Sequence, residues 1–265
     1  TLISYPLEIS MYGLPGLKRV QSTSIFGLSR VNIYFEDGTD IYFARRLVME
    51  RLAKAKEAIP PGLGEPQLGP ISSGMGLILH YYLDDTTGQY SLQELRDLQD
   101  WVVKYHLQTV PGVTEVLGIG GWEKQFQVDL CPHALQRYGL TAPEVVTAVE
   151  RGNLNVGAQF VVEGAEEFTV RAVGLATGIA DLAAVVVRHE GSTPVYLRDV
   201  AEIRTGGAVR RGAQTRGGVE EVVAGSVVKL LGANSSRVIA DVERKLAQVN
   251  AALPEGVRLV PYYEQ

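Results

Sequence analysis

Residues able to bind a metal or act as nucleophiles are few in this chain of 265 residues, and they are scattered. Cys131 is the only cysteine, so neither an internal disulfide nor a CxxC metal or redox site can form. The four histidines lack the HxxxH or HExxH spacing that places two ligands on one helix face. A zinc hydrolase is therefore not expected.

One histidine, His80, is the candidate metal ligand. It lies in the alternating stretch Leu77–Tyr82, which predicts a strand with His80 on the face of Ile78 and Tyr82. Neutral imidazole is the commonest metal ligand in proteins, and it titrates near neutral pH. A packing role within the strand is the alternative.

Three acidic residues lie close together in the stretch Glu36–Asp40. Calcium loops spread their ligands over about twelve residues, so this tighter cluster predicts a strand-to-helix turn with Asp40 as the helix cap.

Gly118–Gly121 resembles a phosphate loop but lacks the following Lys-Ser/Thr and the start of a helix. No Ser-His-Asp or Cys-His set is formed by neighbours in sequence, and we predict neither an enzymatic activity nor a cofactor.

Composition excludes other classes of partner. The net charge is −5 with Lys and Arg scattered, so there is no basic patch for nucleic acid or anionic lipid. Hydrophobic residues make up 46% and charged residues 21%, as in a soluble globular protein. No apolar run reaches the ~18 residues of a membrane span, and no N-terminal signal is present. Because the chain opens on Thr1, we expect a fragment of a longer protein.

Four helices are predicted to end at a proline and glycine stop. Proline cannot continue a helix, and glycine takes the left-handed angles of a helix exit. The stops are at residues 14–17, 59–63, 110–113 and 253–257. Ser91 and Glu94 form a capping box for the third helix, whose apolar stripe is predicted to be Leu95, Leu98, Val102 and Tyr105.

Strands are predicted between these helices, at residues 17–24, 29–36, 76–84, 113–119, 221–231 and 257–262. Residues 1–70 then follow the order αββαβ, which becomes a ferredoxin-like βαββαβ sandwich if one strand precedes Thr1. Two further βαβ halves, 76–119 and 221–262, are predicted to share the sheet of a second sandwich.

A third α+β unit interrupts the second sandwich. Its predicted elements are a strand at 125–130, a helix from the cap Thr141 to Gly152, a hairpin at 159–173 turning near Glu163-Gly164, and strands at 182–187 and 194–197. The predicted fold class is therefore α+β. It has two ferredoxin-like sandwiches, the first lacking its initial strand, and an inserted α+β subdomain.

A series of long motifs runs in order along the whole chain: TLISYPLE (1–8), GLPG (13–16), SIFGLS (24–29), FEDGTDIYFAR (35–45), LQDW (98–101), TVPGV (109–113), GG (120–121), KQFQV (124–128), YGLT (138–141), NVG (155–157) and PVYLRDVAEI (194–203). These motifs resemble the heavy-metal branch of the resistance-nodulation-division (RND) efflux pumps, the CzcA/CusA-like pumps. The resemblance implies the first periplasmic loop of a bacterial inner-membrane protein.

The resemblance also implies an organisation and a mechanism. Residues 1–72 would be a PN1-like porter subdomain, residues 73–124 and 206–265 a split PN2-like porter subdomain, and residues 125–205 a DN-like docking subdomain. The whole pump would be a homotrimer that exports metal cations by proton antiport, joined to a periplasmic adaptor and an outer-membrane channel. The porter subdomains would move as rigid bodies while a cleft opens and closes.

The substrate cleft is expected to be lined by Leu77, Ile119, Trp122 and Glu123. Val209 stands where copper- and silver-exporting members carry a methionine of their relay, which disfavours a soft metal. Leu77 stands where divalent-cation members often carry Glu, which argues against a carboxylate site here and leaves His80 as the nearby ligand. We therefore expect a divalent cation of the Zn, Co, Ni or Cd type.

Two other functions remain open. A free-standing ferredoxin-like ligand-binding or sensory module would have a complete first strand before Thr1 and no hydrophobic flanks in the parent gene. A drug-exporting pump of the same superfamily would have an aromatic-lined cleft. Aromatic residues make up 8% of the chain, and Leu77 and Ile119 are aliphatic, which disfavours that function.

Overall fold

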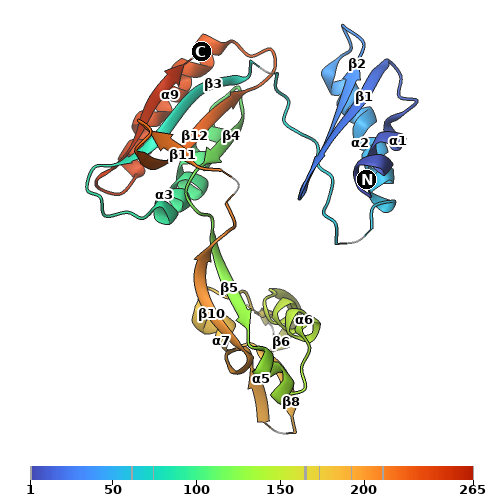
Figure 1. The fold of residues 1–265 in the computed structure, drawn as a ribbon, viewed down its shortest axis with the longest axis vertical. Coiled ribbons are helices and arrows are strands. Elements are labelled where there is room, and N and C mark those ends of the chain that lie inside the picture. Colours follow the sequence, from blue (N-terminus) through green and yellow to red (C-terminus); the bar gives the residue numbers. More distant parts are fainter. Residues whose placement is uncertain are drawn as a thin grey trace.

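The residues described by the structure form three lobes. The computed structural model describes residues 2–60, 62–73, 75–163, 166–172, 174–191, 193–210 and 212–264. The N-terminal lobe, from α1 (Ser4–Met11) to α2 (Ile41–Glu57), is blue in Figure 1. The inserted lobe runs from β5 (Lys124–Leu130) to β10 (Ala201–Gly207). The four-stranded lobe is built from the segments before and after this insert, and the chain leaves it along β5 and returns along β10 (Figure 1).

The N-terminal lobe is a two-stranded hairpin packed against two helices. Strands β1 (Leu17–Ile25) and β2 (Leu28–Phe35) pair antiparallel with each other. The carboxylate of Asp40 accepts the backbone N–H groups of Tyr42 and Phe43 at 3.2 and 3.3 Å. This confirms the predicted cap, which satisfies amide donors that have no partner within the helix.

The strand predicted after α2 is wrong. Residues 62–73, which the structure describes, contain no strand. In the four-stranded lobe described below, the last strand pairs only with the first strand. The described N-terminal lobe begins with the helix α1, so it holds no first strand for a last strand to pair with. The segment is held by side chains instead: Arg45 Nη1 donates to the carbonyl of Gly69 at 2.7 Å, and Leu68 packs against the buried cluster around Met11.

The four-stranded lobe is an antiparallel sheet with helices on one face. Its strands are β3 (Leu77–Asp85), β4 (Val113–Ile119), β12 (Glu220–Lys229) and β13 (Val257–Glu264), and the short β11 (Gln214–Arg216) also pairs with β12. The order across the sheet is β13-β3-β12-β4. The two predicted βαβ halves therefore share one sheet, as predicted.

Two helical segments cover one face of this sheet. The first is continuous through α3 (Leu92–Leu98), the π-helical turn η1 (Gln99–Val103) and α4 (Lys104–Gln108), and the second is α9 (Ser235–Ala252). The capping box is confirmed: the Glu94 carboxylate accepts the Ser91 N–H at 2.8 Å, and Ser91 Oγ accepts the Glu94 N–H at 3.3 Å. Among the described residues, no helix is long and apolar enough to cross a membrane.

The π-helical turn changes which side chains of the first helix are buried. The predicted stripe includes Tyr105, but Tyr105 is exposed, whereas Val103 and Leu107 are fully buried. A π turn closes its hydrogen bonds one residue later than an α turn. Side chains after it are therefore rotated by about one residue's share of a turn, about 100°. The prediction that Tyr105 faces the core is wrong for this reason.

The inserted lobe is built around the paired strands β5 and β10, which match from Lys124↔Gly207 to Leu130↔Ala201. Its other elements are α5 (Pro132–Arg137), α6 (Ala142–Gly152), β6 (Val156–Glu163), β7 (Glu166–Ala172), α7 (Ile179–Ala183), β8 (Val186–Glu190), β9 (Thr193–Tyr196) and α8 (Leu197–Val200). The predicted β6–β7 hairpin is confirmed. Gly164, predicted at its turn, lies outside the described residues.

The strand predicted at 182–187 is partly wrong. Its first residues belong to the helix α7, and the strand β8 begins at Val186. The Asp181 carboxylate accepts both the N–H and the hydroxyl of Thr177, at 2.8 and 2.7 Å, and so closes the turn that leads into this helix. Leu182 is buried on the helix. A short helical turn and a strand give the same apolar run in sequence, so the pattern did not separate them.

Candidate functional site

The face of the four-stranded sheet opposite its helices is open, and His80 lies on it. Its Nδ1 is 2.6 Å from Oγ of Ser226 on the neighbouring strand β12. Its ring stacks on that of Tyr262, with centroids 5.9 Å apart, and lies 5.4 Å from the ring of Tyr263. The imidazole is thus held by a hydroxyl and two phenol rings.

Alternation along β3 places Tyr82 on the same face as His80, but Ile78 does not lie there. Ile78 is fully buried in the core cluster. The pairing of β3 with β12 shifts register between Val227 and Val228, so Ile78 is the extra residue of a β-bulge. A bulge interrupts the period of two. The predicted face for Ile78 is wrong for that reason.

Leu77 and Ile119 lie on this open face without being neighbours. Leu77 is paired with Val228, and Ile119 is paired with Ala224, on opposite sides of β12. Their partners on β12, Val228 and Ala224, are four residues apart along the strand, which is about 13 Å. Both side chains are exposed, at 38% and 40%. They belong to one surface rather than to one pocket.

Charged residues close one end of the open face. Asp84 accepts hydrogen bonds from Arg258, at 2.8 and 3.0 Å, and from Arg216, at 2.8 Å. The bonds from Arg258, together with those from Arg216, hold the pKa of the Asp84 carboxyl below its ordinary value. Arg216 also donates to the hydroxyl of Tyr82 at 3.3 Å. Because two guanidinium groups already neutralise Asp84, this cluster ties β3, β11 and β13 together and offers no free carboxylate to a cation.

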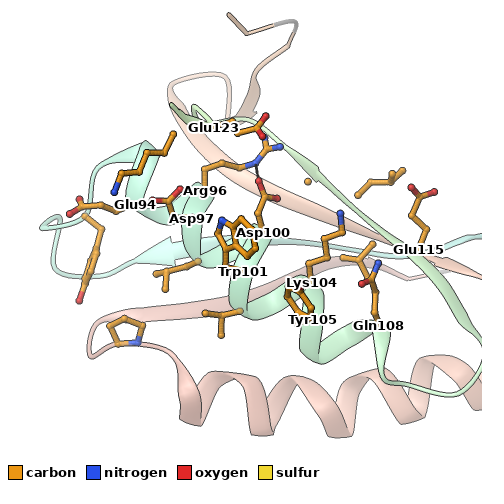
Figure 2. Close-up of a pocket in the computed structure, with 18 of the residues that line it drawn as sticks. Glu94, Arg96, Asp97, Asp100, Trp101, Lys104, Tyr105, Gln108, Glu115 and Glu123 are labelled. Carbon is orange, nitrogen blue, oxygen red and sulfur yellow. Dashed lines mark hydrogen bonds and ion pairs between the residues drawn. The ribbon is translucent and has the colours of Figure 1, made fainter. Parts of the chain in front are cut away.

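A groove of about 1030 Å³ lies between β4 and the helix α3–η1–α4 (Figure 2). Trp101 and Tyr105 line it and are 70% and 60% exposed. Their rings stack with centroids 6.4 Å apart. Of the predicted cleft residues, Glu123 lines this groove. The sequence pattern did not indicate the groove, because it placed Tyr105 in the core and did not reveal the π turn.

Acidic residues outnumber basic residues along the groove. The charged lining residues are Glu94, Asp97, Asp100, Glu115 and Glu123, with Arg96, Lys104 and Lys124. Arg96 pairs with Asp100 at 2.7 Å and donates to the carbonyl of Gly120 at 2.9 Å. The remaining charges leave the groove net negative. An exposed indole beside carboxylates favours a cationic side chain of a partner.

Trp122 packs at the junction between the four-stranded lobe and the inserted lobe. The guanidinium carbon of Arg210 lies 4.0 Å from the centre of the Trp122 ring. The predicted site residues are therefore distributed over three places: His80, Leu77 and Ile119 on the open face, Glu123 in the groove, and Trp122 at the junction.

Metal-binding capacity in the described part of the chain is limited. No group of three or more His, Cys, Asp or Glu side chains that could hold a metal ion occurs among the described residues. His80 has a serine and two tyrosines as its closest polar neighbours. Because a zinc site takes three or four ligands, His80 can supply one ligand and not a complete site.

Comparison with known proteins covers the whole chain. The sequence model of the AcrB/AcrD/AcrF family matches residues 1–265. The chain belongs to the AcrB/AcrD/AcrF family. The resemblance to heavy-metal RND pumps drawn from the motifs is confirmed by a crystal structure of a heavy metal efflux pump, with which the α+β architecture agrees, and by the relatives described next. That structure matches 100% of the chain with a TM-score of 0.87 and 30% identity.

Three relatives within the family show how far the similarity extends. Cobalt-zinc-cadmium resistance protein CzcA of Cupriavidus metallidurans is 41% identical, protein HelA of Legionella pneumophila is 43% identical, and cation efflux system protein CusA of Escherichia coli (strain K12) is 40% identical. Each alignment covers 99% of the chain but 25% of the relative. The chain thus spans about a quarter of the length of its family relatives, and 26% of the crystallised pump.

Proposed function

We propose that this chain is the porter and docking portion of a proton-driven heavy-metal efflux pump, placed in the periplasm as a loop of a bacterial inner-membrane protein. The observation that carries the proposal is the match of the entire chain to a heavy metal efflux pump of known structure. Relatives whose names describe cation efflux and metal resistance support it. The role is transport rather than catalysis, and it needs no resident cofactor.

The proposed cargo is a divalent cation of the Zn, Co, Ni or Cd type. CzcA and CusA are almost equally similar to this chain, so overall identity does not choose between them. Val209 is a residue without a metal-binding side chain, and it is exposed. The imidazole of His80 suits a borderline divalent cation. These two residues favour a divalent ion over a soft monovalent one.

Within the pump, the open face of the four-stranded lobe would form one wall of the substrate cleft. His80, Leu77 and Ile119 all lie on it. The division into PN1-like (1–72), PN2-like (73–124 and 206–265) and DN-like (125–205) subdomains is part of this proposal. Its support is that β5 and β10 pair with each other and not with the four-stranded sheet.

The proposed assembly is a homotrimer joined to a periplasmic adaptor and an outer-membrane channel. The groove in Figure 2 is our candidate contact for the adaptor, because Trp101 is exposed and the lining is net negative. Trp101→Ala should reduce the amount of adaptor recovered with the full-length pump about tenfold or more. Tyr12→Ala, which removes an exposed aromatic ring of the N-terminal lobe, should leave recovery unchanged.

Metal resistance of living cells tests the cargo. Expression of the full-length protein in a metal-sensitive bacterium should raise the tolerated concentrations of Zn²⁺, Co²⁺, Ni²⁺ or Cd²⁺. Protection against organic dyes and drugs alone would reject metal export, and protection against Cu⁺ and Ag⁺ alone would reject the divalent class.

Calorimetric titration tests the role of His80. The chain should bind one of Zn²⁺, Co²⁺ or Ni²⁺ weakly, and His80→Ala should abolish the heat. His133→Ala, which removes an exposed histidine of α5, is the matched control and should leave the heat unchanged. Absence of heat with the parent chain would exclude His80 as a ligand in this chain.

A further inference from the structure

The inserted lobe is joined to the four-stranded lobe by two chain crossings that lie side by side. The outgoing crossing leads from β4 through Gly120, Gly121 and Trp122 into β5, and the returning crossing follows Gly207 at the end of β10. The N–H of Ala208 donates to the carbonyl of Glu123 at 2.8 Å. The β5–β10 ladder therefore continues into the junction itself.

The outgoing crossing is packed tightly against the four-stranded lobe. Gly120 and Gly121 have φ of +82° and +65°, and both are buried. A Cβ on Gly121 would lie 2.6 Å from the carbonyl oxygen of Leu92, at the start of α3. Arg96 donates to the carbonyl of Gly120. The backbone is thus fixed up to the residue that precedes Trp122.

Arg210 links the two crossings to the sheet. Its guanidinium lies over the ring of Trp122, on the outgoing crossing. The same guanidinium forms an ion pair with Glu221 of β12, and the two side chains are 29% and 25% exposed. Gly207 completes the packing, because a Cβ there would lie 2.7 Å from the Trp122 side chain. One side chain thus connects the outgoing crossing, the returning crossing and the sheet.

We propose that Trp122, Arg210 and Glu221 form a latch that holds the inserted lobe at one angle to the four-stranded sheet. Without the latch, the two strands of the ladder could swing about the residues that follow the fixed glycines, at Trp122 on the outgoing crossing and beyond Gly207 on the returning one. Stacking on an indole and pairing with a carboxylate use different parts of the planar guanidinium, so both contacts hold at the same time. This inference concerns the geometry between two lobes and does not rest on the proposed function.

Distances between spin labels test the latch in the full chain. One nitroxide is attached to Cys131, which is exposed near the end of β5, and the other to Gln248→Cys on α9. The parent should give one narrow distance distribution. Arg210→Ala should broaden it at least twofold, and Glu221→Gln, which removes the ion pair and leaves the stacking, should broaden it less.

The control removes an equivalent contact elsewhere. Arg198 lies over the ring of Tyr196 at 4.0 Å within the inserted lobe, so Arg198→Ala should keep the parent width. Hydrogen exchange in β12 and α6 should be unchanged in all variants, which assigns the broadening to motion between lobes. If Arg210→Ala unfolds the chain, the width of the distance distribution in Glu221→Gln tests the latch instead. Parent-like widths in the folded junction variants, or equal broadening with Arg198→Ala, would overturn the proposal.

Discussion

The N-terminal lobe and the four-stranded lobe use the same alternation of strands and helices, but they differ in how much they bury. In the four-stranded lobe, β3 and β12 are paired on both sides, and one continuous buried cluster spans the sheet, α9 and the first helix. In the N-terminal lobe, β1 and β2 pair with each other, and the described buried residues fall into two small clusters.

The difference shows that the number of strands in the sheet, and not the length or capping of the helix, decides the size of the core. The helix α2 is as long as α9 to within one residue, with 17 and 18 residues, and it is correctly capped. It nevertheless faces two strands instead of four. Apolar burial scales with the area removed from water, so the N-terminal lobe should be the less stable part of the chain.

Truncation of a core leucine in each lobe is the most severe test of this comparison. Leu107→Ala, at a fully buried position beneath the four-stranded sheet, should lower the free energy of unfolding of that lobe by about 2–5 kcal/mol. Leu7→Ala should lower the free energy of unfolding of the N-terminal lobe by an amount at or below the low end of that range, because the partly exposed neighbours of Leu7 can close around the gap. Urea unfolding followed by hydrogen exchange in each lobe measures both effects, and equal losses would contradict the comparison.

A smaller effect is expected where the sheet meets a buried ring. A Cβ on Gly225 of β12 would overlap the phenol of Tyr81, whose hydroxyl donates to Gln99 at 3.0 Å. Gly225→Ala should therefore destabilise the four-stranded lobe by about 1–3 kcal/mol through overpacking. Gly212→Ala is the matched control, since no atom lies within 4 Å of its added Cβ. It should be neutral in the same urea titration.

The smallest of the expected effects is that of acid on a turn of the four-stranded lobe. The Asp85 carboxylate accepts the hydroxyl of Thr87 at 2.7 Å and the N–H of Tyr90 at 2.8 Å, and chiefly the Thr87 hydroxyl lowers the pKa of Asp85 to about 2. The unfolded carboxyl titrates near pH 3.9. The unfolded chain therefore takes up this proton first, and the stabilisation is complete above about pH 4 and lost as the pH falls to about 2.

Urea midpoints measured between pH 5 and pH 2 check this expectation. Asp85→Asn should lower stability at pH 5 and should then lose less on acidification than the parent does. Hydrogen exchange should place the difference in the four-stranded lobe. Parallel curves for the two proteins would show that Asp85 does not contribute in this way.

Local signals were enough to predict most helices of this chain. Asp40 and Ser91 cap the helices that follow them, as predicted, and their partners lie within three residues. The strand at Val113–Ile119 was predicted with the bounds observed. Such contacts are encoded in neighbouring residues, so a single sequence is sufficient to find them.

The site was predicted less well, because its geometry depends on contacts across the sheet. Leu77, His80 and Ile119 are brought to one face by strand pairing, but the bulge at Ile78 and the π turn before Tyr105 move side chains away from their expected positions. Trp101, the most exposed ring of the groove, carried no signal in the sequence that separated it from a packing residue.

The amino-acid sequence by itself determined where most helices start and stop, which alternating segments become strands, and to which family the chain belongs. The tertiary structure decided how many strands form each sheet, which side chains share a surface, and how Arg210 connects the two adjacent crossings. The physical reason is the range of the interactions. Caps and turns are satisfied within a few residues, whereas register, bulges and the contacts at the junction join separate elements of the fold.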